Sequence, residues 1–134
     1  MKRIHSLIIV AILGLLVLGT AQPARAGTQP DLTVIGATSV VTGGQWYLKY
    51  TISNKGTASS GTFMITLKDS AGAIKQSLTT PSLSPGSTMS FLHPTGGCKF
   101  YRTIIVDSTN VVFESNELNN TRGYDSIIDP EDLC

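Results

Sequence analysis

The chain has little of the residue types that carry catalysis and zinc binding. Its 134 residues include two cysteines and two histidines, and only His93 lies beyond residue 26. A Ser-His-Asp or Cys-His arrangement needs a histidine beside an orienting acid, whereas His93 precedes Pro94 in an expected turn. Neither a GxSxG nucleophile elbow nor a CxxC ligand pair occurs. We therefore expect no enzymatic activity and interpret His93 as a loop residue. Glu114 and Glu117 could act as paired carboxylates for glycoside hydrolysis, but nothing else in the sequence supports that role.

An excess of positive charge is also missing. The chain has ten Lys and Arg against nine Asp and Glu. Three of the ten basic residues precede residue 27 and all nine acids follow it, so the remainder carries 7 − 9 = −2. Nucleic-acid binding needs basic patches, so we expect no nucleic-acid partner.

A hydrophobic run long enough to span a membrane is absent as well. Lys2 and Arg3 precede an apolar stretch at residues 7–19, and Ala24-Arg25-Ala26 follows it. This order is typical of a secretory signal peptide, and the apolar stretch is shorter than the roughly 17–25 residues of a spanning helix. We expect residues 1–26 to be a cleaved signal peptide, with an uncleaved anchor as the alternative. The protein is then secreted or periplasmic, with no membrane span after cleavage.

Helical periodicity is nearly absent beyond residue 26, and alternating stretches recur between Gly, Pro, Asn and Ser clusters. In residues 45–54, Trp46, Leu48, Tyr50 and Ile52 share one face, as in a half-buried antiparallel strand. Residues 74–80 look like an edge strand, and residues 99–107 like a central strand of undecided inward face. The expected strands are residues 31–36 with a short stretch at 38–41, then 45–54, 62–69, 74–80, 87–92, 99–107 and 121–128.

These strands predict an all-β fold, an antiparallel β-sandwich of about seven strands of the immunoglobulin or fibronectin type III kind. An antiparallel barrel is the alternative. The domain is expected at residues 27–128, where Leu83 fills the core beneath a loop. Residues 129–134 form an acidic C-terminal tail.

Residues 107–120 contain three acids and four asparagines around a short apolar run. Such side chains bond nearby backbone in turns, and their oxygens also suit calcium. As a structural corner, the segment would use Asp107, Glu114, Asn116, Asn119 and Asn120, with Val112 or Phe113 closing the end of the sandwich. As an irregular calcium site without EF-hand spacing, it would use Asp107, Asn110, Glu114, Asn116 and Glu117. No other cofactor is expected.

Cys98 and Cys134 are the only cysteines, and a secreted chain meets an oxidising compartment. If the last two strands pair as a hairpin, Cys98 lies within reach of the tail that carries Cys134. We predict a Cys98–Cys134 disulfide, which would stabilise the fold by about 3–4 kcal/mol in the chain-entropy model. Two free thiols and an intermolecular bridge are the alternatives.

Four segments of the sequence form a further pattern: Pro30-Asp31-Leu32, residues 54–63 from Asn54 to Phe63, Leu83-Ser84-Pro85-Gly86, and the long segment at residues 106–120. Together they resemble the CARDB family, the cell-adhesion-related domain found in bacteria. The resemblance covers residues 30–128 and implies a seven-stranded, fibronectin-like sandwich on a secreted or surface protein. The cysteine pair and the acidic tail are additions to the family's pattern.

The function expected from these features is that of a secreted, non-enzymatic binding module for protein–protein or cell-surface contacts. Its ligand would be an unknown protein or cell-surface molecule, held at exposed sheet edges and loops. The alternative is a carbohydrate-binding or calcium-dependent adhesion domain. For a carbohydrate, Tyr47, Lys49 and Tyr101 would form an exposed aromatic patch.

Overall fold

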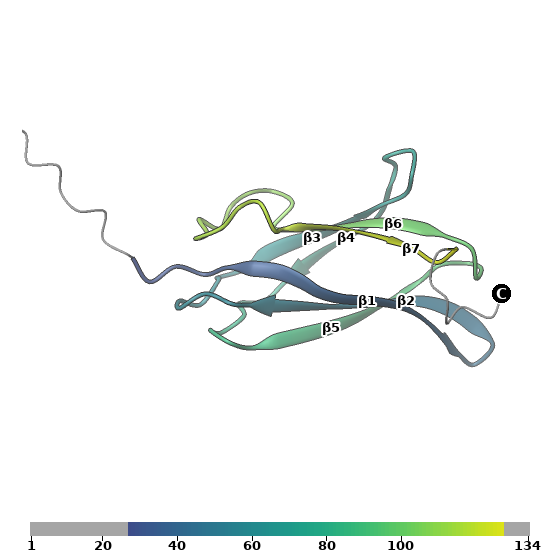
Figure 1. Cartoon of the computed structure of the whole chain (residues 1–134), viewed down its shortest axis with the longest axis horizontal. Coiled ribbons are helices and arrows are strands. Elements are labelled where there is room, and N and C mark those ends of the chain that lie inside the picture. The colour runs from purple at the N-terminus through teal and green to yellow at the C-terminus, as the bar shows by residue number, and fades with distance from the viewer. Residues whose placement is uncertain (1–26, 128–134) are drawn as a thin grey trace, which may run out of the picture.

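The computed structural model describes residues 27–127, which form two antiparallel sheets packed face to face (Figure 1). One sheet has the order β1-β2-β5 and the other β4-β3-β6-β7. The predicted all-β, seven-stranded sandwich is confirmed. Among these residues there is no helix long and apolar enough to span a membrane. The strands are β1 (Leu32–Thr42), β2 (Gln45–Asn54), β3 (Phe63–Lys68), β4 (Ile74–Thr80), β5 (Thr88–Pro94), β6 (Tyr101–Val106) and β7 (Thr121–Asp125).

The two central strands follow the alternation of their sequences. In β2, Leu48, Tyr50 and Ile52 are buried, and the strand pairs with β1 on one side and β5 on the other. β6 lies between β3 and β7 and turns Ile104 and Val106 inward. Its central place and the edge place of β4 were both predicted. The inward parity of β6 was not, because its two faces are similarly apolar.

The core lies between the two sheets. Tyr50 of β2 stacks on Phe91 of β5 with ring centroids 5.2 Å apart, so the aromatic rings of one sheet pack along its inner face. Leu83 is buried beneath its loop, as expected. The larger apolar side chains that fill the rest of the core are Leu32, Leu48, Ile52, Phe63, Ile65, Leu67, Phe100, Ile104, Val106, Val112 and Tyr124.

Three details differ from the sequence-based expectations. The stretches at residues 31–36 and 38–41 are one strand, β1, with a register shift between Val34 and Gly36. β5 continues through His93 and Pro94, so His93 is a buried strand residue and not a loop residue. Pro94 is tolerated there because β5 is an edge strand, which needs fewer backbone donors. β7 ends at Asp125, and residues 1–26 and 128–134 lie outside the described residues.

Asn54, at the end of β2, joins three segments of the chain. Its Oδ1 accepts the N–H groups of Asp31 and Gly56, each at 3.0 Å. Its Nδ2 donates to the carbonyl oxygens of Ala58 and Leu83, each at 2.8 Å. All four hydrogen bonds are made by one fully buried side chain. Asn54 therefore fixes the entry to β1, the turn after β2 and the loop that carries Leu83.

We predict that Asn54→Ala lowers the free energy of unfolding by about 3–5 kcal/mol, because several buried backbone groups lose their partners at once. Asn116→Ala is the matched control, since Asn116 is exposed and accepts one hydrogen bond, from Leu118. Its cost should stay below about 1 kcal/mol. Urea unfolding measures both values, and similar losses in the two variants would contradict the role of Asn54.

Candidate functional site

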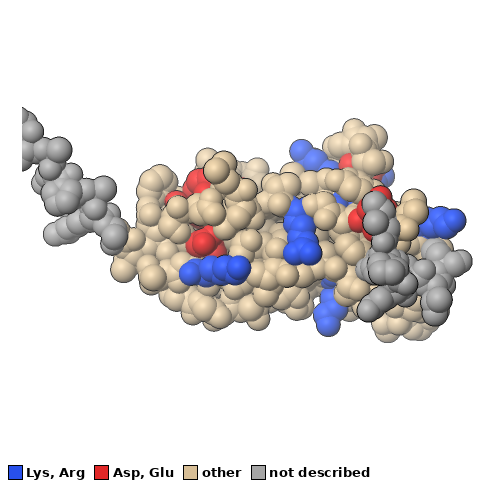
Figure 2. Space-filling view, viewed as in Figure 1, with Lys and Arg blue, Asp and Glu red and all other residues tan. Residues whose placement is uncertain are grey.

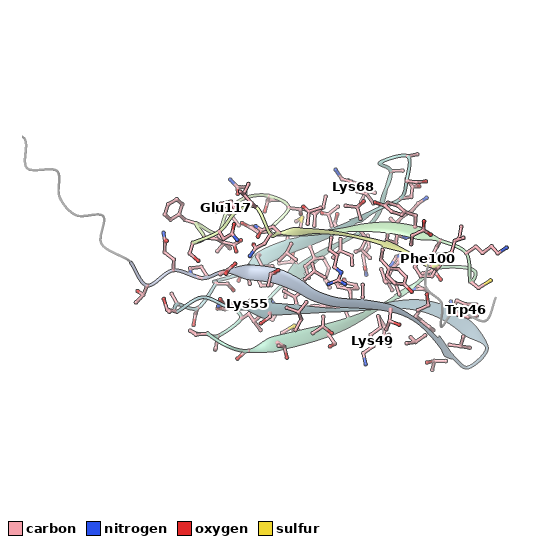
Figure 3. All side chains as sticks on the ribbon, viewed as in Figure 1. Trp46, Lys49, Lys55, Lys68, Phe100 and Glu117 are labelled. Atoms are coloured by element: carbon pink, nitrogen blue, oxygen red, sulfur yellow. The ribbon has the colours of Figure 1, made fainter. Side chains whose placement is uncertain are left out.

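The β6–β7 loop, residues 107–120, lies at the end of the sandwich where the chain enters at residue 27 (Figure 1). Sequence analysis placed both candidate roles, the corner and the calcium site, in this segment. Figure 3 shows Glu117 of this loop and Phe100, which precedes β6, toward opposite ends of the molecule. The loop is built by two buried carboxylates and a set of amide side chains.

Asp107 starts the loop by accepting hydrogen bonds from the backbone of residues that follow it. Its Oδ1 and Oδ2 accept the N–H groups of Val111 and Val112 at 3.2 and 2.8 Å, and its carbonyl oxygen accepts the N–H of Asn110 at 2.7 Å. Asp107 and Asn110 have φ of 47° and 52°, a left-handed conformation that Asp and Asn tolerate better than most residues. This tight turn buries Val112 in the core, so Val112 closes the sandwich and Phe113 does not.

Glu114 fastens the middle of the loop to the opposite sheet. Its Oε2 accepts the backbone N–H of Leu32 in β1, and its Oε1 accepts Nδ2 of Asn120 at 2.9 Å. The carboxylate is almost fully buried. Burial, with smaller repulsions from Glu117 and Asp107, raises the pKa of Glu114 to about 7 against the opposing effect of the two hydrogen bonds. The side chain therefore takes up a proton near neutral pH.

Ser115 and the expected corner residue Asn119 tie the loop to the segment before β1. Ser115 donates its N–H to the carbonyl oxygen of Pro30 at 2.9 Å, and Asn119 Nδ2 donates to Asp31 Oδ1 at 2.8 Å. Within the loop, Asn116 Oδ1 accepts the N–H of Leu118 at 3.1 Å. The loop is thus held along its length by hydrogen bonds, many of them to residues 30–32.

Three large apolar side chains of this loop point into solvent. Val111 is 66%, Phe113 78% and Leu118 95% exposed. We call these three residues the apolar loop residues. Sequence analysis missed Val111 and Leu118 and counted Phe113 only as a possible core residue. The signal that could have found them is the presence of four apolar residues in a segment where only one, Val112, is needed for the core.

Four of the five expected calcium ligands, Asp107, Glu114, Asn116 and Glu117, accept hydrogen bonds from N–H groups. Both carboxylate oxygens of Asp107 accept backbone N–H groups. Those of Glu114 accept the N–H of Leu32 and an amide N–H of Asn120. Glu117 Oε1 accepts the N–H of Glu114 at 2.9 Å. No cluster of three or more acidic, histidine or cysteine side chains suited to a metal occurs within residues 27–127. The oxygen atoms of these side chains therefore fit backbone N–H groups better than a cation.

Other predicted site residues lie elsewhere. Tyr47 and Lys49 are on β2, and Tyr101 is on β6 of the other sheet. Their inward neighbours, such as Leu48 and Arg102, are buried, so the three side chains face outward from opposite sheets. The expected single aromatic patch is therefore wrong.

Cys98 follows β5 at the end of the molecule away from the β6–β7 loop. No free cysteine occurs within residues 27–127. Its expected partner, Cys134, lies outside the described residues, so the disulfide stays a prediction.

The CARDB family model matches residues 29–123. The chain belongs to the CARDB family. A search of curated proteins found no match. The family match includes β1 to β6, the whole β6–β7 loop and the first three residues of β7. The resemblance stated from the sequence motifs is therefore confirmed.

Two solved structures are similar to this CARDB domain. One is a domain of a Methanosarcina acetivorans protein described as a cell surface protein, with 27% identity, a TM-score of 0.62, and 72% of this chain and 90% of that chain covered. The other is the CARDB domain of a Pyrococcus furiosus protein in complex with di-metal ions, with 24% identity, a TM-score of 0.58, and 74% and 93% covered. The second likeness shows the fold alone.

We predict that Glu114 makes the fold less stable as pH rises. Its pKa is raised from 4.5 to about 7, so its stabilising contribution is complete below pH 4.5 and is lost as pH passes through 7. The loss amounts to at most about 3 kcal/mol. The pKa of His93 is lowered by burial and by Arg102, so His93 acts in the opposite sense below pH 6.5.

The difference between wild type and Glu114→Gln removes the His93 contribution, because His93 titrates in both proteins. Denaturant unfolding at several pH values should show wild type losing stability relative to Glu114→Gln between pH 4.5 and 8. A pH-independent difference between the two proteins would contradict the buried, titrating carboxylate.

We predict that millimolar calcium changes the melting temperature by less than about 1 °C, because a ligand that binds the native state must stabilise it. Both carboxylate oxygens of Asp107 and Oε1 of Glu117 already accept N–H donors. Magnesium at the same concentration is the control for ionic strength. A calcium-specific increase of several degrees would show that the loop rearranges to bind the ion.

Proposed function

We propose that this CARDB domain is a non-enzymatic, secreted module of the cell surface that binds a protein through its apolar loop residues, Val111, Phe113 and Leu118. The observation that carries the proposal is their exposure on a loop that the fold holds in place. Large apolar side chains in solvent mark contact sites when they gather on one element. The CARDB family and the cell-surface description of the M. acetivorans relative support the location.

The loop is suited to binding because it is ordered before the partner arrives. Asp107 and Glu114 hold the loop through four hydrogen bonds: two from loop backbone N–H groups, one from the Leu32 backbone and one from the Asn120 side chain. A preorganised loop loses little conformational freedom on binding, which leaves more of the contact energy for affinity. Each apolar side chain that a partner covers fully contributes about 1.5–3 kcal/mol, so three such residues supply a useful contact.

A protein partner fits this surface better than an anionic membrane or a glycan. Glu117 is exposed within the same loop, and an acid there disfavours a negatively charged lipid surface. The face drawn in Figure 2 carries separated charged side chains on a mostly uncharged surface. For a glycan, the expected aromatic patch is divided between two sheets, so no specific observation favours that alternative.

We predict that Phe113→Ser combined with Leu118→Ser reduces binding of the fluorescently labelled protein to cells of its source by at least about tenfold. Both side chains are exposed, so the melting temperature should change little. Ile74→Ser is the matched control, because Ile74 is also an exposed apolar residue, at the start of β4. Protease treatment of the cells should abolish wild-type binding.

Three results would contradict the proposal. They are unchanged binding by the double variant, an equal loss in Ile74→Ser, and binding that survives protease treatment of the cells. The last result would indicate a glycan or lipid ligand.

A further inference from the structure

The two sheets of the sandwich differ in their number of strands. One has three, in the order β1-β2-β5, and the other has four, in the order β4-β3-β6-β7. The edge strands β1 and β7 lie against each other: Tyr124 Oη accepts the N–H of Ser39 at 2.8 Å, and Arg122 Nη1 donates to the carbonyl oxygen of Val34 at 3.4 Å. Counted from this side, β2 faces β6 and β5 faces β3. Within residues 27–127, no strand is left to face β4 (Figure 1).

The side chains near this place are incompletely covered. Ile65 of β3 is 1% exposed, whereas Leu78, its partner in β4, stays partly exposed. Met89 and Phe91 of β5 pack against the core and are also only partly buried. A further strand beside β5 would lie opposite β4 and would cover these three apolar side chains.

The backbone of β5 can pair with such a strand. At its two ends, the carbonyl oxygen of Ser87 and the N–H of Thr95 bond to β2, each at 3.0 Å. The antiparallel register is continuous between these points, so alternate residues bond to β2 and the residues between them direct N–H and C=O away from it. The outward residues are Thr88, Ser90, Leu92 and Pro94. The first three present N–H groups at an open edge, and Pro94, which has no N–H, ends the row.

The other sheet edges are protected against an added strand. Side chains of Glu114 and Tyr124 accept outward N–H groups of β1. β4 pairs with β3 through a register shift and carries the exposed Lys75, and β7 is a five-residue strand that lies against β1. Short length, irregular pairing and lysine are the usual means of blocking strand addition. Residues 88–92 of β5 have none of them.

A pocket of about 390 Å³ adjoins the β5 edge, and its lining indicates the charge of a fitting strand. Lys49 of β2 is the only Lys, Arg, Asp or Glu in β1, β2 and β5. Figure 3 shows Lys49 pointing away from the opposite sheet, and it forms no ion pair within residues 27–127. An acidic side chain on the outer face of an added strand would therefore find a complementary charge. The pocket is lined by Val40, Thr42, Lys49, Ser90, Phe91 and Leu92.

We propose that β5 binds an extended peptide segment of a partner protein as the fourth strand of its sheet. Apolar side chains of the peptide point inward and cover Leu78, Met89 and Phe91, and an acidic side chain points outward and pairs with Lys49. In strand addition, main-chain hydrogen bonds supply affinity and the pockets for alternate side chains supply specificity. The site is separate from the apolar loop residues, so its test is independent of the function proposed for them.

Hydrogen exchange of the ¹⁵N-labelled protein tests the pairing. The probe is a short peptide in which valine alternates with glutamate and threonine in turn. At millimolar peptide, the amides of Ser90 and Leu92 should exchange at least about tenfold more slowly. The amide of Phe91, which bonds to β2, should be protected with and without peptide. Unchanged exchange at Ser90 and Leu92 overturns the proposal. Protection without peptide that grows with protein concentration also overturns it and assigns the edge to a second copy of the chain.

Two N-methylated versions of the peptide separate backbone pairing from other contacts. One is methylated on every valine and the other on every glutamate and threonine. Alternate N–H groups of a strand point to opposite sides, so only one of the two sets can bond to β5, in either strand direction. One peptide should therefore lose at least about tenfold in affinity, and the other should bind as before. Similar affinities of the two methylated peptides would overturn strand addition.

A charge variant tests the partner's chemistry. Lys49→Gln should weaken binding of the glutamate peptide at least about threefold and leave binding of a matched glutamine peptide unchanged. Lys55→Gln is the matched control, because Lys55 is an exposed lysine just beyond the other end of β2 (Figure 3). Equal effects of Lys49→Gln on the two peptides would overturn the pairing of Lys49 with an acid.

Discussion

The hydrogen bond from the Leu32 backbone N–H to the buried carboxylate of Glu114 joins the β6–β7 loop to the first strand of the opposite sheet. Without it, Leu32 would keep a buried N–H without a partner and the loop would lose its fixed point on β1. On its other side, the segment before β1 is held by Asn54 and passes so close to Gly56 that a Cβ there would lie 2.2 Å from the carbonyl oxygen of Gln29. The chain entry is therefore fixed between two loops.

A buried carboxylate is a costly way to fasten a loop. The pKa of Glu114, raised to about 7, shows that burial outweighs the two donors that favour its charged form. The benefit is order in a segment with no regular structure. Once residues 107–120 are fixed, Val112 can be buried while Val111 and Phe113 beside it stay in solvent. The same carboxylate thus serves both the closure of the sandwich and the presentation of a contact surface.

Local pattern was enough to predict the strands, the edge place of β4 and the central place of β6. The alternation in β2 and the apolar run in β6 persist in the structure, because both strands bury their faces as their sequences indicate. The position of residues 107–120 between the last two strands also follows from strand order alone. Sequence therefore located the candidate site, although it did not choose between a corner and a cation site.

The missed details depend on contacts between distant segments. Nothing near Asn54 indicates that it bonds to both Asp31 and Leu83. His93 was misplaced because the Pro94 that follows it suggested a turn, whereas pairing with β2 extends the strand. The division of Tyr47 and Tyr101 between two sheets depends on the order of strands within each sheet.

Native-state hydrogen exchange at the Leu32 amide tests the Glu114 contact most directly. In the wild type this amide should exchange only through global unfolding, at the rate of core amides such as that of Ile65 in β3. In Glu114→Ala the Leu32 amide should exchange much faster than the Ile65 amide, because only the local contact is lost. A Leu32 amide that exchanges as fast as an exposed loop amide in the wild type would contradict the role of Glu114.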